Sequence, residues 1–282
     1  MAREIRATGS SRVSTIGILM NKAKSADGTE IAYDTYGDGP PVIIISGAFS
    51  SREHQVVSTF AELLSPSLKV IAYDRRGRGD SGDTAPYAVQ REVEDLAAVV
   101  EAVGGSASVY GLASGATLAF EAAAAGVSIT TLVLQEPPYV AGDDEPKVPA
   151  DFADELAAAV ADDRRGDAIA LFMTKQLGIP AEAIADMKHS ATWETLDALA
   201  HTLAYDAAIT GDGSVPADRA AAVRAETTVI AGTNSPEWMQ TGARAIADVI
   251  PGAKYRPLEG MDHYSMDPTV VAPVLLEIFT AK

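Results

Sequence analysis

The chain has 282 residues, of which 47% are hydrophobic, 22% charged and 6% aromatic, an ordinary globular balance with enough apolar material for a core. Its formal net charge of −17 argues against nucleic acid and anionic membranes as partners, because charges of like sign repel one another. No apolar run reaches the roughly 18 residues of a membrane span. The absence of cysteine excludes disulfides and thiolate chemistry and fits the reducing cytoplasm, where we expect the protein.

The first nineteen residues, MAREIRATGSSRVSTIGIL, lack the continuous apolar segment of a secretory signal. They contain arginine, serine and a single acidic residue, so a transit-like segment is formally open. A loosely ordered tail over residues 1–19 is the better interpretation.

Residues 20–141 show an alternation of strand and helix patterns. A hairpin with its turn at Ala26-Asp27-Gly28 comes first, followed by the buried strand of PVIIIS. Then come a helix over 51–64, the strand KVIAYD, the glycine-rich loop RRGRGDSGD, a helix over 90–103, the strand ASVYG, a helix over 114–125 and the strand ITTLVLQ. Buried strands alternating with helices predict an α/β protein with a mostly parallel sheet covered on both faces.

This alternation is interrupted over residues 142–225, which contain only helical patterns such as ADFADELAAAVADD, GDAIALFMTKQLG and SATWETLDALAHTLAYD. The sheet pattern returns with TTVIAG, a helix over 240–250, the strand AKYRPLEG and a terminal helix from Pro268. The sequence therefore predicts an α/β core of residues 20–141 and 226–282, with a helical cap of residues 142–225 over the strand ends.

In open parallel sheets, ligands bind beyond the carboxyl ends of the strands. The residues that follow the predicted strands are therefore the candidate site: Ser46, Gly47, Ala48, Phe49, Ala113, Ser114, Glu136 and His263. A tight glycine-flanked turn, a carboxylate and a histidine, in that chain order, are the arrangement of the α/β-hydrolase triad. The turn reads Gly111-Leu112-Ala113-Ser114-Gly115, so alanine stands where the motif G-x-S-x-G has its serine.

From about Lys22 to its end, the chain resembles the α/β-hydrolase fold family in YDRRGRGDSG, in this turn, in the helical insertion and in the late His263. It is similar to bacterial α/β-hydrolases whose turn reads G-x-S-S-G-A, where this chain has Gly111-Leu112-Ala113-Ser114-Gly115-Ala116. The resemblance implies the α/β-hydrolase fold with a cap inserted between sheet strands, and hydrolysis through a serine at position 113. It implies neither a metal nor another cofactor.

The resemblance also implies roles for the neighbouring residues. The N–H groups of Ala48 and Ser114 would form the oxyanion hole, and His263 would be the general base. We expect Glu136 to be its acidic partner, because the fungal zearalenone lactonases use a glutamate at that place and also have a G-x-S-S-G turn. The hydroxyl of Ser114 is a weak candidate for a displaced nucleophile, since the next residue on such a turn points elsewhere.

Two other positions compete with Glu136 for the role of the acid. The commonest acid site of the fold follows TTVIAGTNS, where this chain has Asn234, which cannot carry the charge. Asp262 is adjacent to the histidine in sequence, and we expect it to point away from the imidazole.

The residues around these loops favour an uncharged, fairly apolar small-molecule substrate, because basic residues are not evident near them. The candidate substrate-binding residues are Gly47, Phe49, Pro138, Tyr139, Trp193 and Met261. For Trp193, packing within the cap is the plainer interpretation.

Three accounts of Ala113 stay open. In the first, the natural protein is a serine ester or lactone hydrolase, and alanine replaces its nucleophile as in a substrate-trapping variant. In the second, Ala113 is native and a His263–Glu136 dyad does general acid–base chemistry, as in lyases, cyclases or cofactor-free oxygenases. In the third, the chain binds a small molecule without catalysis. The oligomeric state, monomer or homodimer, is also open.

Overall fold

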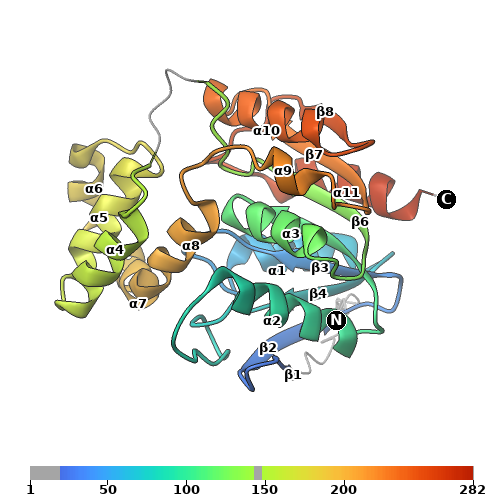
Figure 1. The fold of residues 1–282 in the computed structure, drawn as a ribbon, viewed down its shortest axis with the longest axis horizontal. Helices are drawn as coiled ribbons and strands as arrows, with labels where there is room; N and C mark the ends of the chain where they lie inside the picture. Colours follow the sequence, from blue (N-terminus) through green and yellow to red (C-terminus); the bar gives the residue numbers. More distant parts are fainter. Residues whose placement is uncertain (1–19, 143–147, 282) are drawn as a thin grey trace, which may run out of the picture.

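A computed structural model describes residues 20–142 and 148–281, with an eight-stranded sheet at its centre (Figure 1). The strands are β1 (Asn21–Lys24), β2 (Glu30–Tyr36), β3 (Pro41–Ile45), β4 (Lys69–Tyr73), β5 (Ala107–Leu112), β6 (Ile129–Gln135), β7 (Glu226–Gly232) and β8 (Lys254–Leu258). Their order is β1-β2-β4-β3-β5-β6-β7-β8. Strand β2 runs antiparallel to both neighbours and every other pair after it is parallel, which confirms the predicted mostly parallel sheet.

Helices cover both faces of this sheet (Figure 1). Helices α1 (Gln55–Leu64) and α11 (Pro268–Thr280) pack on one face, and α2 (Val89–Ala102), α3 (Ser114–Ala124) and α10 (Glu237–Val249) pack on the other. Strand β3 shows why its sequence is apolar throughout: Val42 and Ile44 contact the first layer, whereas Ile43 and Ile45 contact the second.

The described part of the chain between β6 and β7 is mostly helical, as predicted. It contains α4 (Phe152–Ala161), α5 (Arg165–Lys175), α6 (Ala181–Met187), α7 (Ala191–Leu199), a 3₁₀ turn (Ala200–Thr202), α8 (Leu203–Thr210) and α9 (Ala217–Ala220). Helices α4 to α7 stand beside the sheet, and α8 leads back to it (Figure 1). They have an apolar cluster of their own, which includes Phe152, Ile169, Phe172 and Leu203.

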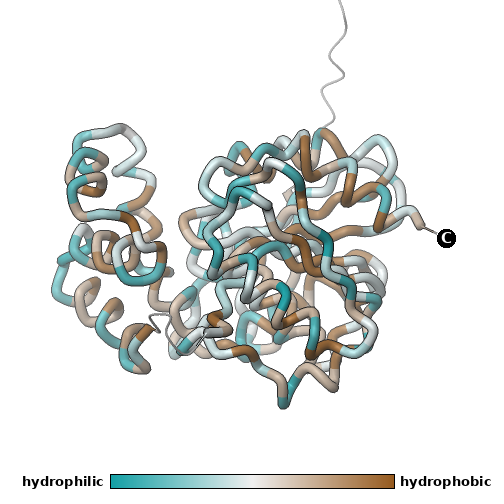
Figure 2. The backbone as a smooth tube through the Cα atoms, turned by 90° about the horizontal axis from the view of Figure 1, so that it is seen from above, coloured by the Kyte–Doolittle hydropathy of each residue, from teal (hydrophilic) through white to brown (hydrophobic). Residues whose placement is uncertain are grey.

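Seen from above, this helical group stands apart from the sheet, whose interior is the most hydrophobic part (Figure 2). The division into core and cap at residues 142 and 225 stays a prediction. The predicted tail, residues 1–19, and residues 143–147 lie outside the described residues. No helix in the described part of the chain is long and apolar enough to cross a membrane.

Two helices begin three or four residues away from the predicted start, in each case because of their first turn. Helix α1 begins at Gln55 rather than at residue 51, since the imidazole of His54 caps it by accepting a hydrogen bond from the N–H of Val56. Helix α10 begins at Glu237 rather than at residue 240, directly after Pro236. Proline has no N–H and a fixed φ, so it suits a helix start.

Candidate active site

Strand β5 passes into helix α3 through a sharp turn at Ala113, whose φ of 51° and ψ of −123° lie outside the usual regions for a residue with a side chain. The turn closes because glycines flank it. A Cβ on Gly115 would stand 2.3 Å from the carbonyl oxygen of Ile45, and one on Gly111 would stand 2.5 Å from the carbonyl oxygen of Gly115. The turn therefore brings α3 against β3 and presents Ala113 at the edge of the sheet.

His263 and Glu136 meet at the same edge. The imidazole Nδ1 of His263, in the loop after β8, lies 2.7 Å from Oε2 of Glu136, which follows β6 and is fully buried. The other carboxylate oxygen of Glu136 accepts hydrogen bonds from the N–H of Gly232 at 2.8 Å and from the hydroxyl of Ser235 at 2.5 Å. Three donors, from the end of β7, the loop after it and the loop after β8, thus fix the carboxylate.

These contacts set the protonation of the pair. Burial raises the pKa of the Glu136 carboxyl, but the hydrogen bonds and charge of His263, with the donors Ser235 and Gly232, outweigh burial and hold it below its ordinary value of 4.5. A carboxylate only accepts hydrogen bonds, so Nδ1 of His263 donates to Glu136, and Nε2 is the ring nitrogen left for other partners. In the described part of the chain Nε2 has no hydrogen-bond partner.

Ala113 and His263 line the same two cavities. The first, which we call the neck, has a volume of about 40 Å³ and is also lined by Ala48, Ser114 and Glu136. The second, the Phe49 cavity, has a volume of about 320 Å³ and shares Ala48 and Leu177 with the neck as well. A ligand in the neck would therefore lie against both Ala113 and His263.

A third cavity adjoins the neck and is named here the Trp238 cavity. Its volume is about 350 Å³, and it shares four lining residues with the neck: Pro138, Gln176, Leu177 and Trp238. Leu177 lines all three cavities. The three cavities thus adjoin in a row, with Ala113 and His263 in the middle.

The two expected oxyanion-hole residues, Ala48 and Ser114, both line the neck. Ser114 is the first residue of α3, where backbone N–H groups have no acceptor within the helix. Among the described residues, no acceptor is found for the N–H of Ala48 or of Ser114. Both N–H groups therefore lack an acceptor in the described part of the chain, and the dipole of α3 favours a negative group near its first residue, Ser114.

The hydroxyl of Ser114 is held in a buried cluster of charged side chains. It donates a hydrogen bond of 2.7 Å to the carboxylate of Asp206 on α8, which also accepts hydrogen bonds of 2.7 Å from Arg75 and from Arg78. Burial raises the pKa of Asp206, but the charges of Arg78 and Arg75 and the hydroxyl of Ser114 hold it below its ordinary value. This geometry gives no support to Ser114 as a displaced nucleophile.

The expected lack of basic residues near these loops is wrong. Arg75 and Arg78 belong to the glycine-rich loop after β4, and both are buried beneath the site. Arg78 also donates to the carbonyl oxygen of Gly47 at 2.6 Å, and a second carboxylate, Glu92, binds Arg75 through two hydrogen bonds. The sequence could not predict that these arginines lie near the site, because the loop and its partners are far apart in the chain.

The two other positions considered for the acid, Asp262 and Asn234, make hydrogen bonds elsewhere rather than with the imidazole. Oδ1 of Asp262 accepts a hydrogen bond from the N–H of Tyr264 at 2.9 Å, as in a turn, and so points away from the ring as expected. The amide of Asn234 donates to the carbonyl oxygen of Gly260. In the described ranges no group of three or more acidic or histidine side chains is placed to hold a metal ion.

The six expected substrate-binding residues divide into two sets. Gly47 and Phe49 line the Phe49 cavity, and Pro138 lines the neck and the Trp238 cavity. The other three lie elsewhere, packed in apolar clusters: Tyr139, Trp193 and Met261.

Each of these three has a packing role that explains its place. The ring of Tyr139 is 2% exposed and meets Phe120 edge to face at 6.3 Å. Trp193 packs within the helical group, as the plainer interpretation held. Met261, two residues before His263 in the same loop, is 3% exposed and packs in the apolar cluster on the α1 and α11 side of the sheet.

The residues that sequence reasoning missed are Trp238, Gln176 and Leu177. Trp238 stands in the first turn of α10, and the helix start directly after Pro236 was the indication that could have placed it near the strand end. Gln176 and Leu177 follow α5, and no local pattern in the sequence relates them to the sheet edge.

Comparison with known proteins decides the family. The model of the alpha/beta hydrolase family matches residues 42–274 of the chain. The chain belongs to the α/β-hydrolase family. An α/β hydrolase from Sphaerobacter thermophilus has a solved structure that is 47% identical, with a TM-score of 0.85, over 92% of this chain and 100% of that one.

More distant solved structures share the fold of this α/β hydrolase. An esterase from a Rhodococcus species is 23% identical, with a TM-score of 0.66, over 93% of this chain and 98% of that one. An enol-lactonase from Burkholderia xenovorans is 17% identical, with a TM-score of 0.65, over 93% of this chain and 100% of that one.

Proposed function

We propose that the site is that of an ester or lactone hydrolase in which position 113 carries the nucleophile as serine, and that the chain with Ala113 binds the substrate without forming an acyl-enzyme. The observation that carries this proposal is that Ala113 and the His263–Glu136 pair line one narrow cavity together with two available N–H groups. The esterase and lactonase among the similar structures are consistent with it.

The backbone of Ala113 supports a serine at that position. A positive φ in a residue with a side chain costs on the order of 1–3 kcal/mol, and such strain is concentrated at functional sites. In this chain the strained residue carries only a methyl group, which cannot act as a nucleophile, an acid or a base. A hydroxyl at the same Cβ would stand in the cavity that His263 also lines.

The reaction follows from these positions. As a serine oxygen bonds to the acyl carbon, Nε2 of His263 takes the hydroxyl proton while Glu136 holds the ring. The carbonyl oxygen becomes negative and accepts hydrogen bonds from the N–H groups of Ala48 and Ser114. The imidazolium then gives its proton to the departing alkoxide, which leaves as the alcohol. A water molecule, deprotonated by the same histidine, attacks the acyl carbon. The bond to the serine oxygen breaks, that oxygen takes the proton back from the imidazolium, and the acid is released.

A second candidate is favoured by the completeness of the His263–Glu136 pair without any hydroxyl. With Ala113 in place, Nε2 could take a proton from an acidic C–H or O–H of a substrate in the neck, whose anion the same N–H groups would bind. General-base catalysis alone supplies about 10² to 10⁴-fold, sufficient for a preactivated substrate. This account needs turnover by the chain as it stands.

The variant Ala113→Ser tests the first proposal. We expect it to hydrolyse members of a panel of p-nitrophenyl esters and lactones up to about 10⁶-fold faster than the parent, the loss that removal of such a nucleophile causes. It should also react with a fluorophosphonate, with the mass of the adduct found on residue 113.

The control is Ala113→Ser combined with His263→Ala, which should lose both the hydrolysis and the labelling. A folded Ala113→Ser protein that neither hydrolyses these substrates nor reacts with the fluorophosphonate would contradict the proposed hydrolase function. Turnover by the parent chain that disappears in His263→Ala would instead establish the dyad.

A further inference from the structure

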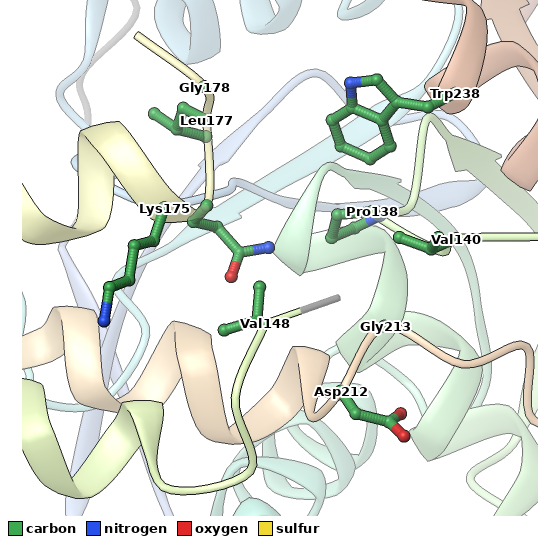
Figure 3. Close-up of a pocket in the computed structure, with 10 residues that line it drawn as sticks. Pro138, Val140, Val148, Lys175, Leu177, Gly178, Asp212, Gly213 and Trp238 are labelled. Atoms are coloured by element: carbon green, nitrogen blue, oxygen red, sulfur yellow. The ribbon is translucent and has the colours of Figure 1, made fainter. Parts of the chain in front are cut away.

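The Trp238 cavity is large enough for an organic group, and most of its lining residues are apolar or glycine. Its volume of about 350 Å³ is more than twice the roughly 150 Å³ that suffices for benzene in an engineered apolar cavity. Its apolar walls come from the loop after β6 and from α10 on one side and from the segments around α4 and α5 on the other (Figure 3). They comprise Pro138, Val140, Val148, Leu177 and Trp238. Such a lining fits an apolar group of one or two rings.

Gln176 is the uncharged polar side chain in this lining. It lines both the neck and the Trp238 cavity, and its backbone N–H is fixed by the carbonyl oxygen of Phe172 at 2.8 Å. Its side-chain Oε1 is buried, with no hydrogen-bond partner in the described part of the chain. A buried amide oxygen without a donor is costly, so each such group calls for an explanation. A ligand that supplies an N–H or O–H would satisfy it.

The charged side chains of the cavity are engaged elsewhere. Lys175 binds Glu155 at 2.9 Å and lies over the ring of Phe152, and Oδ1 of Asp212 accepts a hydrogen bond from the N–H of Ser214 at 2.9 Å. Figure 3 shows the Lys175 ammonium and the Asp212 carboxylate on opposite sides of the cavity. The lining therefore favours an uncharged donor over an ion.

We propose that the Trp238 cavity binds an apolar arm of the substrate and that this arm carries an uncharged hydrogen-bond donor, a hydroxyl or an amide N–H, which Gln176 accepts. The inference rests on the proposed function for the carbonyl group in the neck. Because Gln176 lines both the neck and the Trp238 cavity, the donor lies within a few bonds of that carbonyl. The substrate class is thus an aryl or alicyclic ester or lactone with a nearby hydroxyl or N–H.

The chain with Ala113 allows a binding test free of turnover. Of its two tryptophans, Trp193 lines none of the three cavities, so Trp193→Phe leaves Trp238 as the sole indole reporter. The probes are methyl 3-phenylpropanoate, each enantiomer of methyl 3-hydroxy-3-phenylpropanoate, and the corresponding 3-methoxy esters. We expect one hydroxy ester to change Trp238 fluorescence and to bind about tenfold more tightly than the other two kinds, the worth of one hydrogen bond between neutral groups.

The variants assign this preference to Gln176. Gln176→Leu should reduce the preference to about onefold, Gln176→Glu should retain it because a carboxylate still accepts, and Gln90→Leu, a change of an exposed glutamine on α2, should leave it unchanged. Equal binding of the hydroxy and unsubstituted esters, tighter binding of a methoxy ester, or a preference that survives Gln176→Leu would overturn the inference. So would binding seen by calorimetry that leaves Trp238 fluorescence unchanged, or no binding of any probe.

Failure of this inference and failure of the proposed function give different results. If Ala113→Ser hydrolyses p-nitrophenyl esters but the parent does not prefer the hydroxy ester, only the inference about Gln176 is wrong. If the parent prefers the hydroxy ester but Ala113→Ser does not hydrolyse esters, only the proposed hydrolase function is wrong.

Discussion

Phe49, Ala113 and Glu136 have φ values of 56°, 51° and 47°, the left-handed region that residues with side chains seldom adopt. Each follows a parallel strand, β3, β5 or β6, and each lines the neck or the Phe49 cavity. Strain of this kind persists where the surrounding packing imposes it. The sequence indicates that these residues follow strands, but it contains no pattern for their conformation, because none of them is glycine.

The carboxylate of Glu136 should be essential to catalysis once serine is present. In Ala113→Ser, the further change Glu136→Gln should lower kcat by about 10⁴-fold, as removal of the charge does in other triads, while Asp262→Asn should have little effect. Steady-state kinetics on a p-nitrophenyl ester would measure both, with circular dichroism as the check on folding. A larger loss in Asp262→Asn than in Glu136→Gln would transfer the role to Asp262.

The lowered pKa of Glu136 makes a separate prediction about stability. A carboxyl whose pKa is depressed in the folded state contributes stability that is present above its unfolded value, about 4.5, and is lost as pH falls through the folded value. The difference in free energy of unfolding between the parent and Glu136→Gln should therefore be greatest near pH 7 and shrink below about pH 4.5. Urea unfolding of both proteins from pH 7 to pH 3.5 measures it, and a difference independent of pH contradicts the assignment.

At the scale of elements, the sequence predicted every strand of the sheet. Strands β3 to β7 have apolar runs between turn residues, as buried parallel strands do, and the turn at Ala26-Asp27-Gly28 indicated the hairpin of β1 and β2. The sequence also predicted the helical stretch between β6 and β7. It could not predict which helical residues line the site. Gln176 and Leu177 reach the site because α5 packs against segments that are distant in the chain. Such packing produces no periodic pattern in the sequence from which it could be predicted.

The close approach of α3 to β3 should make Gly115 irreplaceable. A Cβ there would stand 2.3 Å from the carbonyl oxygen of Ile45, a backbone atom that cannot move alone. Gly115→Ala should thus lower the free energy of unfolding by several kcal/mol or prevent folding, as overpacking does. Gly166→Ala, in α5, meets only the Trp193 ring at 3.6 Å and should be neutral or stabilising by up to about 1 kcal/mol.

Chemical denaturation of the two alanine variants beside the parent gives this comparison. A Gly115→Ala protein as stable as the parent would show that α3 can withdraw from β3 at little cost. Loss of ester hydrolysis in Ala113→Ser with Gly115→Ala, in a fraction that still folds, would show that the turn needs the close approach.

At the scale of the whole molecule, the net charge of −17 does not come from the interior. Among the described residues, the buried charged side chains nearly cancel, with four arginines against six carboxylates: Arg52, Arg75, Arg76, Arg78, Asp34, Asp74, Glu92, Asp95, Glu136 and Asp206. The surface therefore carries most of the negative charge and repels itself. Composition alone could not reveal this, since it does not distinguish buried from exposed charges.

Salt should for this reason stabilise the protein. Raising NaCl from about 10 mM to about 0.5 M shortens the Debye length from about 30 Å to a few ångström and screens the repulsion. The urea midpoint at pH 7 should rise across this range, and the rise should vanish near pH 4.5, close to the sequence pI of about 4.5. A midpoint that falls with salt at pH 7 would mean that exposed ion pairs outweigh the repulsion.

The contacts that build the site join residues very far apart along the chain. Glu136 and His263 are separated by 127 positions, Ser114 and Asp206 by 92, and Arg75 and Asp206 by 131. Contacts of such long range are slow to form, because the entropy of closing a large loop is lost before they are made. On a ribosome, the hairpin, β3 and the turn at Ala113 would emerge long before the histidine that faces them. The site is therefore a late product of folding, and the growing chain carries an incomplete pocket until its last strand and loop have been synthesised.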